Sequence, residues 1–253
     1  METPSFLNKL NNIFGNFTQQ ILSKSKDKDP IRTHFNNTQS STWNWVFYGD
    51  SITHGVAHTH GWRSFPEIFQ ERVRWELKKQ ADIIINTAYS GQTAYNLSKN
   101  DHFKKFVACY NPNVVFLLVG INDISLPNAS IDKYKQNLNS IVRQIRKLGA
   151  IPIIQNYPPI AKSENPDYIR RYELLPQYNE VIKDIAKDNK AIFIDHWSYW
   201  KNNCKSLDSW LGETIHQGAQ GHLAMAINIF KELGIYSEDS QCSKVLEITK
   251  DSL

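Results

Sequence analysis

The sequence has few cysteines, and none of them are paired at a spacing typical of a metal site or a disulfide framework. Only three occur among 253 residues, namely Cys109, Cys204 and Cys242. An odd total without close spacing argues against a disulfide-stapled fold and against a tetrahedral zinc site. Reduced thiols in a cytoplasm are the simplest interpretation, and one disulfide between Cys204 and Cys242 stays open as the alternative.

Long apolar runs and clusters of one charge are also missing. No run of about 20 apolar residues occurs, so we expect no transmembrane segment. The first 22 residues lack an uninterrupted apolar stretch with a small-residue cleavage site, which argues against a signal peptide and favours a cytoplasmic location. The 29 basic and 25 acidic side chains are spread along the chain. Without a basic cluster, we expect no nucleic-acid partner.

The amino-terminal part of the sequence differs from the rest. Apolar residues within 6–22 follow the spacing of an amphipathic helix. The opposite face carries mostly Asn and Gln, so we expect this helix to dock on its own domain or on a second subunit, giving a homo-oligomer, rather than on a membrane. Residues 23–42 are polar and resemble a linker. We therefore divide the chain into a helix and linker at 1–42, a main domain at 43–236 and a tail at 237–253.

Within the main domain, short apolar runs alternate with longer helical patterns. The expected strands are residues 45–48, 83–86, 114–119, 151–154 and 191–194. The expected helices are residues 64–79, 94–108, 131–148, 174–188 and 219–233. Strands separated by helices of this length imply right-handed crossovers and a parallel sheet. We therefore predict an α/β fold, a three-layer α/β/α sandwich with five parallel strands.

Polar clusters follow each of the first three expected strands. They are Gly49-Asp50-Ser51, Ser90-Gly91 and Gly120-Ile121-Asn122-Asp123. Because active sites of open parallel sheets form outside the carboxyl ends of the strands, these clusters should meet at one edge. The chain has no Gly-x-Ser-x-Gly, so the nucleophile elbow of α/β-hydrolases is absent.

Four segments, in order, resemble the blocks of the SGNH (GDSL-like) hydrolases. They are Phe47-Tyr48-Gly49-Asp50-Ser51-Ile52-Thr53, Ser90-Gly91-Gln92-Thr93, Gly120-Ile121-Asn122-Asp123, and Glu213-Thr214-Ile215-His216 followed by Gly221-His222. The resemblance runs from about residue 45 to residue 233 and implies the flavodoxin-like fold of that family. It also implies a serine esterase that uses neither a metal nor an organic cofactor.

The resemblance assigns roles to matching residues. Ser51 would attack the ester carbonyl, and His216 would take the serine proton and pass it to the leaving alcohol. The N–H groups of Ser51 and Gly91 and the side-chain amide of Asn122 would hold the oxyanion. One such donor typically contributes about 10²–10³-fold to the rate.

The last block departs from the family pattern. Glu213 stands where an aspartate is usual, and Gln217-Gly218 replaces Pro-Asn after the histidine. Glutamate also serves in triads, so we favour Glu213 as the group that orients His216. Asp208 is the alternative acid, and a backbone carbonyl is a third possibility.

Other polar and aromatic residues near these blocks carry weaker predictions. His54, His58 and His60 lack an accompanying carboxylate or cysteine, so we interpret them as loop histidines that line a pocket rather than as a metal site. Asp50 and Asp123 are expected to brace the loops, and Ser90 is a rival nucleophile. The candidate substrate contacts are His54, Trp62, Arg63, Tyr157 and Trp210.

The sequence thus predicts hydrolysis of carboxylic esters, with short acyl groups such as acetyl on a carbohydrate as the first expectation. A lysophospholipase or thioesterase that acts on longer acyl chains is one alternative. The other is a non-catalytic module that binds acylated glycans.

Overall fold

Five parallel strands form one sheet at the centre of the computed structural model, which describes residues 27–37 and 41–244. The strands are β1 (Asn44–Gly49), β2 (Ile83–Asn86), β3 (Val114–Leu118), β4 (Ile151–Gln155) and β5 (Ile192–Ile194). Their order is β2-β1-β3-β4-β5, and every neighbouring pair is parallel. The predicted five-stranded sheet is confirmed.

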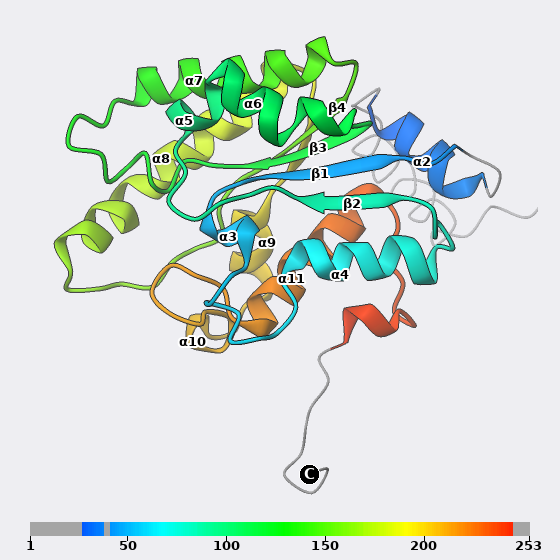
Figure 1. Ribbon diagram of the computed structural model, residues 1–253. Coiled ribbons are helices and arrows are strands. Elements are labelled where there is room, and N and C mark those ends of the chain that lie inside the picture. The colour runs from blue at the N-terminus through cyan, green and yellow to red at the C-terminus, as the bar shows by residue number, and fades with distance from the viewer. Residues whose placement is uncertain (1–26, 38–40, 245–253) are drawn as a thin grey trace, which may run out of the picture.

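Helices cover both faces of this sheet (Figure 1). One face carries α5 (Ala94–Ser98), α6 (Asn100–Phe106), α7 (Ile131–Lys147) and α8 (Pro166–Asp188). The other carries α4 (Phe65–Glu71), α9 (His196–Asn203) and α11 (Ala219–Leu233). The short helices α3 (Ser51–His54) and α10 (Leu207–Trp210) lie in the loops between them. The three-layer α/β/α sandwich is therefore confirmed.

The apolar pattern of each strand matches its place in the sheet. All five side chains of β3, the central strand, are fully buried. The edge strand β2 is only partly covered, and Ile83 at its start is 51% exposed. Strands buried on both faces need continuous apolar sequence, whereas an edge strand does not. The longest continuous apolar run, residues 114–119, therefore marks the centre of the core.

Several predicted helices differ in their bounds. The helix expected at 64–79 is α4 followed by a π-helical stretch, η1 (Arg72–Glu76). The helix expected at 94–108 is broken at Lys99, which is extended between α5 and α6, before the 3₁₀ turn η2 (Ala108–Tyr110). Helix α8 begins eight residues before the expected Leu174 and continues through Pro176. Its first two turns are mostly exposed and contain one aliphatic residue, Ile169, so the apolar pattern did not reveal them.

The segment predicted as a linker is partly helical. Helix α2 (Lys28–Asn36) buries Ile31 completely. His34, on the same helix, lies 2.7 Å through its Nε2 from a carboxylate oxygen of Asp82. The prediction of a linker was wrong here, because two inward-facing side chains anchor an otherwise polar stretch. The amphipathic helix expected at 6–22 lies outside the described residues.

The described part of the predicted tail packs against the end of η1. The 3₁₀ turn η3 (Gln241–Ser243) directs the N–H groups of Gln241 and Cys242 to one oxygen of Glu76, at 2.7 and 3.0 Å. The other Glu76 oxygen accepts from Ser240 and from Arg72. Burial raises the pKa of Glu76, but these hydrogen bonds outweigh it and hold the pKa at about 2. Residues 237–244 are therefore attached to the domain.

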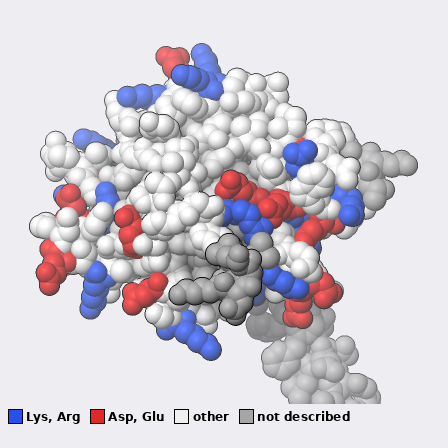
Figure 2. Space-filling model, turned by 60° about the horizontal axis from the view of Figure 1, so that its bottom comes forward, with Lys and Arg blue, Asp and Glu red and all other residues white. Residues whose placement is uncertain are grey.

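The structure also bears on the expectations for the cysteines, for membrane-spanning helices and for surface charge. Cys109, Cys204 and Cys242 are all free thiols, so the Cys204–Cys242 disulfide left open above does not form. Within residues 27–37 and 41–244, no helix combines the length and apolarity needed to cross a bilayer. On the face shown in Figure 2, basic and acidic side chains are interspersed, with no wide area of one sign.

Candidate active site

Ser51 lies at the carboxyl end of β1, where the chain turns directly into a short helix. It is the first residue of α3, and the side chain of Asp50 caps that helix by accepting the N–H of Ile52 at 3.1 Å. The first N–H groups of a helix have no partner within it, so the Ser51 N–H is available at this position. The turn presents both the hydroxyl and the N–H of Ser51 at the sheet edge.

Asp50 and Tyr157 form a buried brace beneath this turn. The Tyr157 hydroxyl donates to a carboxylate oxygen of Asp50, and neither residue has exposed surface. Burial raises the pKa of Asp50 to about 7, although the hydrogen bonds from Tyr157 and Ile52 oppose the rise. Tyr157 was expected to contact a substrate. That expectation was wrong, because the ring packs inside the core and its hydroxyl fixes the Ser51 turn.

His216 reaches Ser51 from a loop in the last part of the chain. Its Nε2 lies 2.8 Å from Ser51 Oγ, and its Nδ1 is hydrogen-bonded to Glu213 Oε1. Residues Leu211 and Gln217 pair across the loop base, which closes the turn that holds Glu213 and His216 on the same side. Burial lowers the pKa of the imidazole, and the charges of His58 and Arg171 lower it further against the opposing effect of Glu213.

Of the two candidate acids, the structure brings only Glu213 to the imidazole. Asp208 lies on α10 and is exposed, without a hydrogen bond to His216. Within the described residues, no backbone carbonyl accepts a hydrogen bond from the His216 ring. Ser51, His216 and Glu213 therefore form one continuous chain of hydrogen bonds, which is the arrangement that lets a serine hydroxyl lose its proton.

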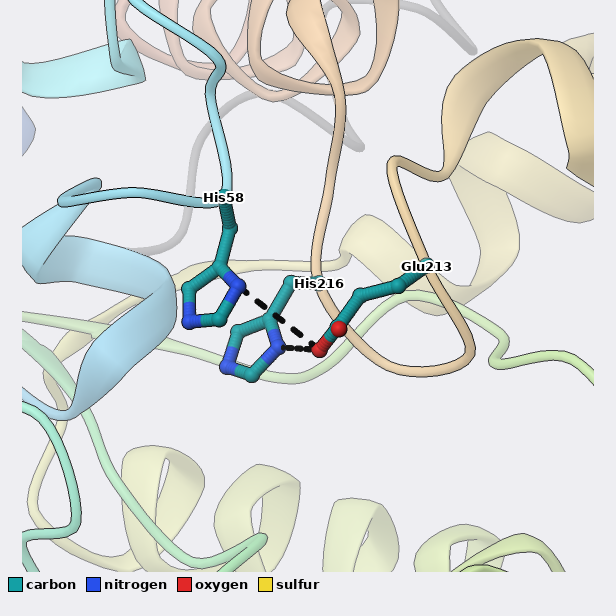
Figure 3. A group of neighbouring side chains, drawn as sticks. All are labelled: His58, Glu213 and His216. Carbon is teal, nitrogen blue, oxygen red and sulfur yellow. Dashed lines mark hydrogen bonds and ion pairs between the residues drawn. The ribbon is translucent and has the colours of Figure 1, made fainter.

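A second histidine adjoins this chain. His58 stacks face to face on His216, with ring centroids 3.5 Å apart and an interplanar angle of 2°, and its Nδ1 lies 3.7 Å from Glu213 Oε1 (Figure 3). Ligand atoms of the three side chains lie within 4.8 Å of one another, close enough to consider a metal ion. A histidine binds metal through a lone pair in its ring plane, so two parallel stacked rings must tilt before both can bind one ion. The geometry fits a shared carboxylate better than a metal site.

The loops after β2 and β3 carry the residues that were expected to be oxyanion donors. Gly91 has φ +80°, a left-handed backbone conformation that glycine adopts without the steric cost it has for other residues. No other atom lies close to the position where a side chain would start, so the space beside its Cα is open. The side-chain amide of Asn122 donates one N–H to the carbonyl of Gln92 at 2.9 Å, which ties the two loops together. An amide has two donors, so the second N–H of Asn122 stays available for a ligand.

Asp123 also connects the loops that follow β2 and β3. Both of its carboxylate oxygens accept the N–H of Ala94, at 2.9 and 3.1 Å, where α5 begins. Burial raises the pKa of Asp123 to about 6. Asp50 and Asp123 thus act as braces in the structure, as their positions beside the strand ends suggested.

The remaining candidate contacts are divided between the site and its surroundings. His54 lies on α3 and bonds through Nδ1 to the Ser90 hydroxyl at 3.1 Å, beside exposed Tyr89. Trp62 is 40% exposed in the loop that also carries His58. Arg63 is paired with Glu71, and Trp210 packs edge-on against buried Trp200. His54 and Trp62 therefore keep a surface for a ligand, whereas Arg63 and Trp210 have structural partners.

Sequence reasoning missed one side chain of this region and the contacts of another. His58 was interpreted as a loop histidine that lines a pocket, but its stacking on His216 was not foreseen, because the two residues lie far apart in the chain. Arg171 was not considered, because the helix that carries it was expected to begin only at Leu174. A signal was present for Arg171: it precedes Leu175 and Tyr178 by four and seven residues, the spacing of one helix face.

Comparison with known proteins agrees with this fold. The sequence is 26% identical over 210 residues to an acetylxylan esterase from Geobacillus stearothermophilus, covering 75% of this chain and 93% of that protein. A solved structure of that esterase superposes with a TM-score of 0.64 at 20% identity, covering 79% of this chain and 98% of that one.

A second relative is larger. An uncharacterized protein from Mycoplasma pneumoniae is 31% identical over 148 residues, which are 56% of this chain but only 16% of that protein. The family model described as GDSL-like lipase/acylhydrolase matches residues 47–224, from β1 into α11, and so includes every residue of the Ser51–His216–Glu213 chain. The protein described here therefore belongs to the GDSL-like lipase/acylhydrolase family of carboxylic ester hydrolases.

Proposed function

We propose that the protein hydrolyses carboxylic esters through an acyl-serine intermediate on Ser51. The observation that carries this proposal is the hydrogen-bond chain from Ser51 Oγ through both nitrogens of His216 to Glu213. The lowered pKa of His216 keeps its imidazole neutral near pH 7, the form that a general base needs.

In the first half of the reaction, Ser51 Oγ bonds to the ester carbonyl carbon while its proton passes to His216 Nε2. The negative charge on the former carbonyl oxygen is held by the N–H groups of Ser51 and Gly91 and by the Asn122 amide. The bond to the alcohol oxygen then breaks, and His216 returns the proton to that oxygen. Glu213 stabilises the imidazolium between these steps.

In the second half, a water molecule takes the place of the alcohol. His216 accepts one water proton while the water oxygen bonds to the acyl carbon. The bond to Ser51 Oγ breaks, the proton moves from His216 to Ser51, and the carboxylic acid leaves. This sequence restores the starting enzyme without any cofactor.

We propose acetyl or other short acyl esters on a carbohydrate as the substrate. The support is the relative named acetylxylan esterase, together with exposed Tyr89 and Trp62 beside the loops of the site, since aromatic faces pack well against sugar rings. A mostly apolar hollow of about 560 Å³ lies between α8 and α9, but none of the proposed catalytic residues lines it. It gives little support to the longer-chain lysophospholipase or thioesterase alternative.

The alternative of a non-catalytic acyl-glycan binder is weakened by the geometry. Binding alone requires no hydroxyl aligned with a buried imidazole that is itself held by a carboxylate. A cytoplasmic location, and oligomer formation through residues 6–22, stay predictions. Deletion of residues 1–26, which spares α2, followed by measurement of molecular mass and activity, would test the second of these.

The test is hydrolysis of p-nitrophenyl acetate, butyrate and octanoate by the wild type, Ser51→Ala and Ser90→Ala. We expect kcat/KM to fall by at least about 10³-fold in Ser51→Ala, because the nucleophile is lost. Ser90→Ala removes the neighbouring hydroxyl of the rival nucleophile and should keep most of the rate. Acetate should be the preferred acyl group. No turnover by the wild type, or an equal rate in Ser51→Ala, would sink the proposal and favour the binding module.

A further inference from the structure

Arg171 lies on the inward face of α8, in the helical turns that precede the part packed on the sheet. Leu175 and Tyr178, four and seven residues later, are buried, so helical periodicity places Arg171 on the same face. The chain enters α8 from the carboxyl end of β4, and its first turns therefore lie at the edge of the sheet that carries Ser51.

The guanidinium group is fixed beside the turn that carries Asn122. Its Nε donates to Ser125 Oγ at 2.7 Å, and the Ser125 N–H in turn donates to the Asn122 carbonyl at 3.2 Å. One face of the guanidinium lies over the Tyr168 ring, with its central carbon 5.5 Å from the ring centroid. The terminal nitrogens are thus held near the proposed oxyanion donor.

The positive charge of Arg171 acts on His216 and on the brace Asp50 without being neutralised by a neighbouring carboxylate. It lowers the pKa of both Asp50 and His216. Across residues 27–37 and 41–244, no carboxylate forms an ion pair with it. The two buried acids of the region are bonded elsewhere, Asp50 to Ile52 and Tyr157, and Asp123 to Ala94.

A cation ordered at the active-site edge with unused donors suits a ligand of opposite charge. The planar guanidinium binds carboxylate and phosphate oxygens through two parallel hydrogen bonds. We propose that the terminal nitrogens of Arg171 bind an anionic group, a carboxylate or a phosphate, on the ester substrate, so that the preferred substrates are esters of acidic sugars. This inference rests on the proposed function and narrows its substrate class.

The experiment compares acetate release from three acetylated sugars: methyl glucoside, which is neutral, glucuronic acid and glucose 6-phosphate. Each is tested with the wild type, Arg171→Gln, Arg171→Lys and Arg143→Gln. Arg143 is exposed in the later half of α7, so the control variant Arg143→Gln removes the same charge at a different place on the protein. A hydrogen-bonded charge pair is worth about 10- to 100-fold in kcat/KM.

We expect the wild type to favour at least one acidic ester by about that factor, and the favoured acid identifies carboxylate or phosphate. Arg171→Gln should abolish the preference, because kcat/KM should fall much further for the acidic ester than for the neutral one, and Arg171→Lys should retain part of it. Arg143→Gln should match the wild type. A wild type without preference, or an equal loss on neutral and acidic esters in Arg171→Gln, overturns the inference and leaves Arg171 a brace for the Asn122 turn.

A binding measurement separates this inference from the proposed function. Calorimetric titration of the wild type and Arg171→Gln with unacetylated glucuronic acid and glucose 6-phosphate needs no turnover. If no ester is hydrolysed but binding of one acid depends on Arg171, the proposed function fails and the anion site stands. If both proteins bind the acids equally, or neither binds them, the anion site is refuted whatever the hydrolysis shows.

Discussion

Two histidine–carboxylate pairs lie at opposite ends of the sheet, and only one is placed to do chemistry. His34 and Asp82 meet near the amino end of β1, where their side chains are 1% and 3% exposed. His216 and Glu213 meet at the carboxyl end, where the Glu213 side chain is 45% exposed. Each imidazole stacks on another ring, His34 on Trp43 and His216 on His58.

The difference lies in what surrounds each carboxylate. Asp82 also accepts the indole N–H of Trp45 at 2.9 Å and the backbone N–H of Trp43 at 3.1 Å, so its oxygens are committed to holding α2 and β1 together. The partly exposed Glu213 carboxylate binds Nδ1 of His216, and Nε2 of the same imidazole faces the Ser51 hydroxyl. A histidine–acid pair therefore becomes a catalytic candidate only when its other nitrogen meets a nucleophile.

Exchanging each histidine for alanine should separate the two roles most strongly. In His216→Ala we expect kcat/KM to fall by at least about 10³-fold, because the base is lost, with little change in stability. In His34→Ala we expect the free energy of unfolding to fall by about 2–3 kcal/mol, because Asp82 loses a buried partner, with kcat nearly unchanged. Ester kinetics and urea unfolding measure both. If His34→Ala were the inactive variant, the comparison would be reversed.

Replacing the carboxylates of the two pairs by amides should give smaller effects, with Glu213 affecting activity and Asp82 affecting stability. Glu213→Gln removes the acceptor that orients His216, and we expect kcat/KM to fall by about 10²-fold. Asp208→Asn is the matched control and should keep wild-type activity. Asp82→Asn should leave kcat unchanged but lower the free energy of unfolding by about 1–3 kcal/mol. A loss of activity in Asp208→Asn instead of Glu213→Gln would show that the wrong acid has been assigned.

The smallest expected effect is on the pH profile. His216 works as a base only when neutral, so kcat/KM should fall as pH drops through its pKa. Because burial lowers that pKa below the ordinary 6.5, the acid limb should lie below pH 6.5. In His58→Gln a neighbouring positive influence is removed, and the limb should move to higher pH. A limb above pH 6.5 in the wild type, or one that moves to lower pH in His58→Gln, would contradict this account.

The parts of the fold that follow local rules could be predicted from the sequence. The bounds of β2 and α11 agree with the prediction to the residue, because apolar runs and helical periodicity depend on neighbours in the chain. Helix α2 could not be recognised this way. Its two anchoring residues, Ile31 and His34, are buried by residues that lie far along the chain, so the local sequence does not show that they anchor a helix.

The same distinction applies to the candidate site. Ser51, Gly91, Asn122 and His216 stand in ordered motifs next to strand ends, and the structure brings them to one edge. The stacking of His58 on His216 depends on how two distant loops meet, which no spacing reveals. Tyr157 shows the opposite failure, since its position after β4 suggested an open site whereas its ring is enclosed. Proximity in sequence indicated the edge of the sheet but not the direction of a side chain.

The segment from Glu76 to Asp82 secures both extremities of the described chain. Asp82 holds helix α2, and Glu76, six residues earlier, collects the hydrogen bonds of the closing 3₁₀ turn. A single protease cut within this segment would therefore loosen both extremities together. By the same reasoning, a fragment trimmed after residue 236 would leave the Glu76 carboxylate short of four donors, so an expression boundary beyond residue 244 is the safer choice.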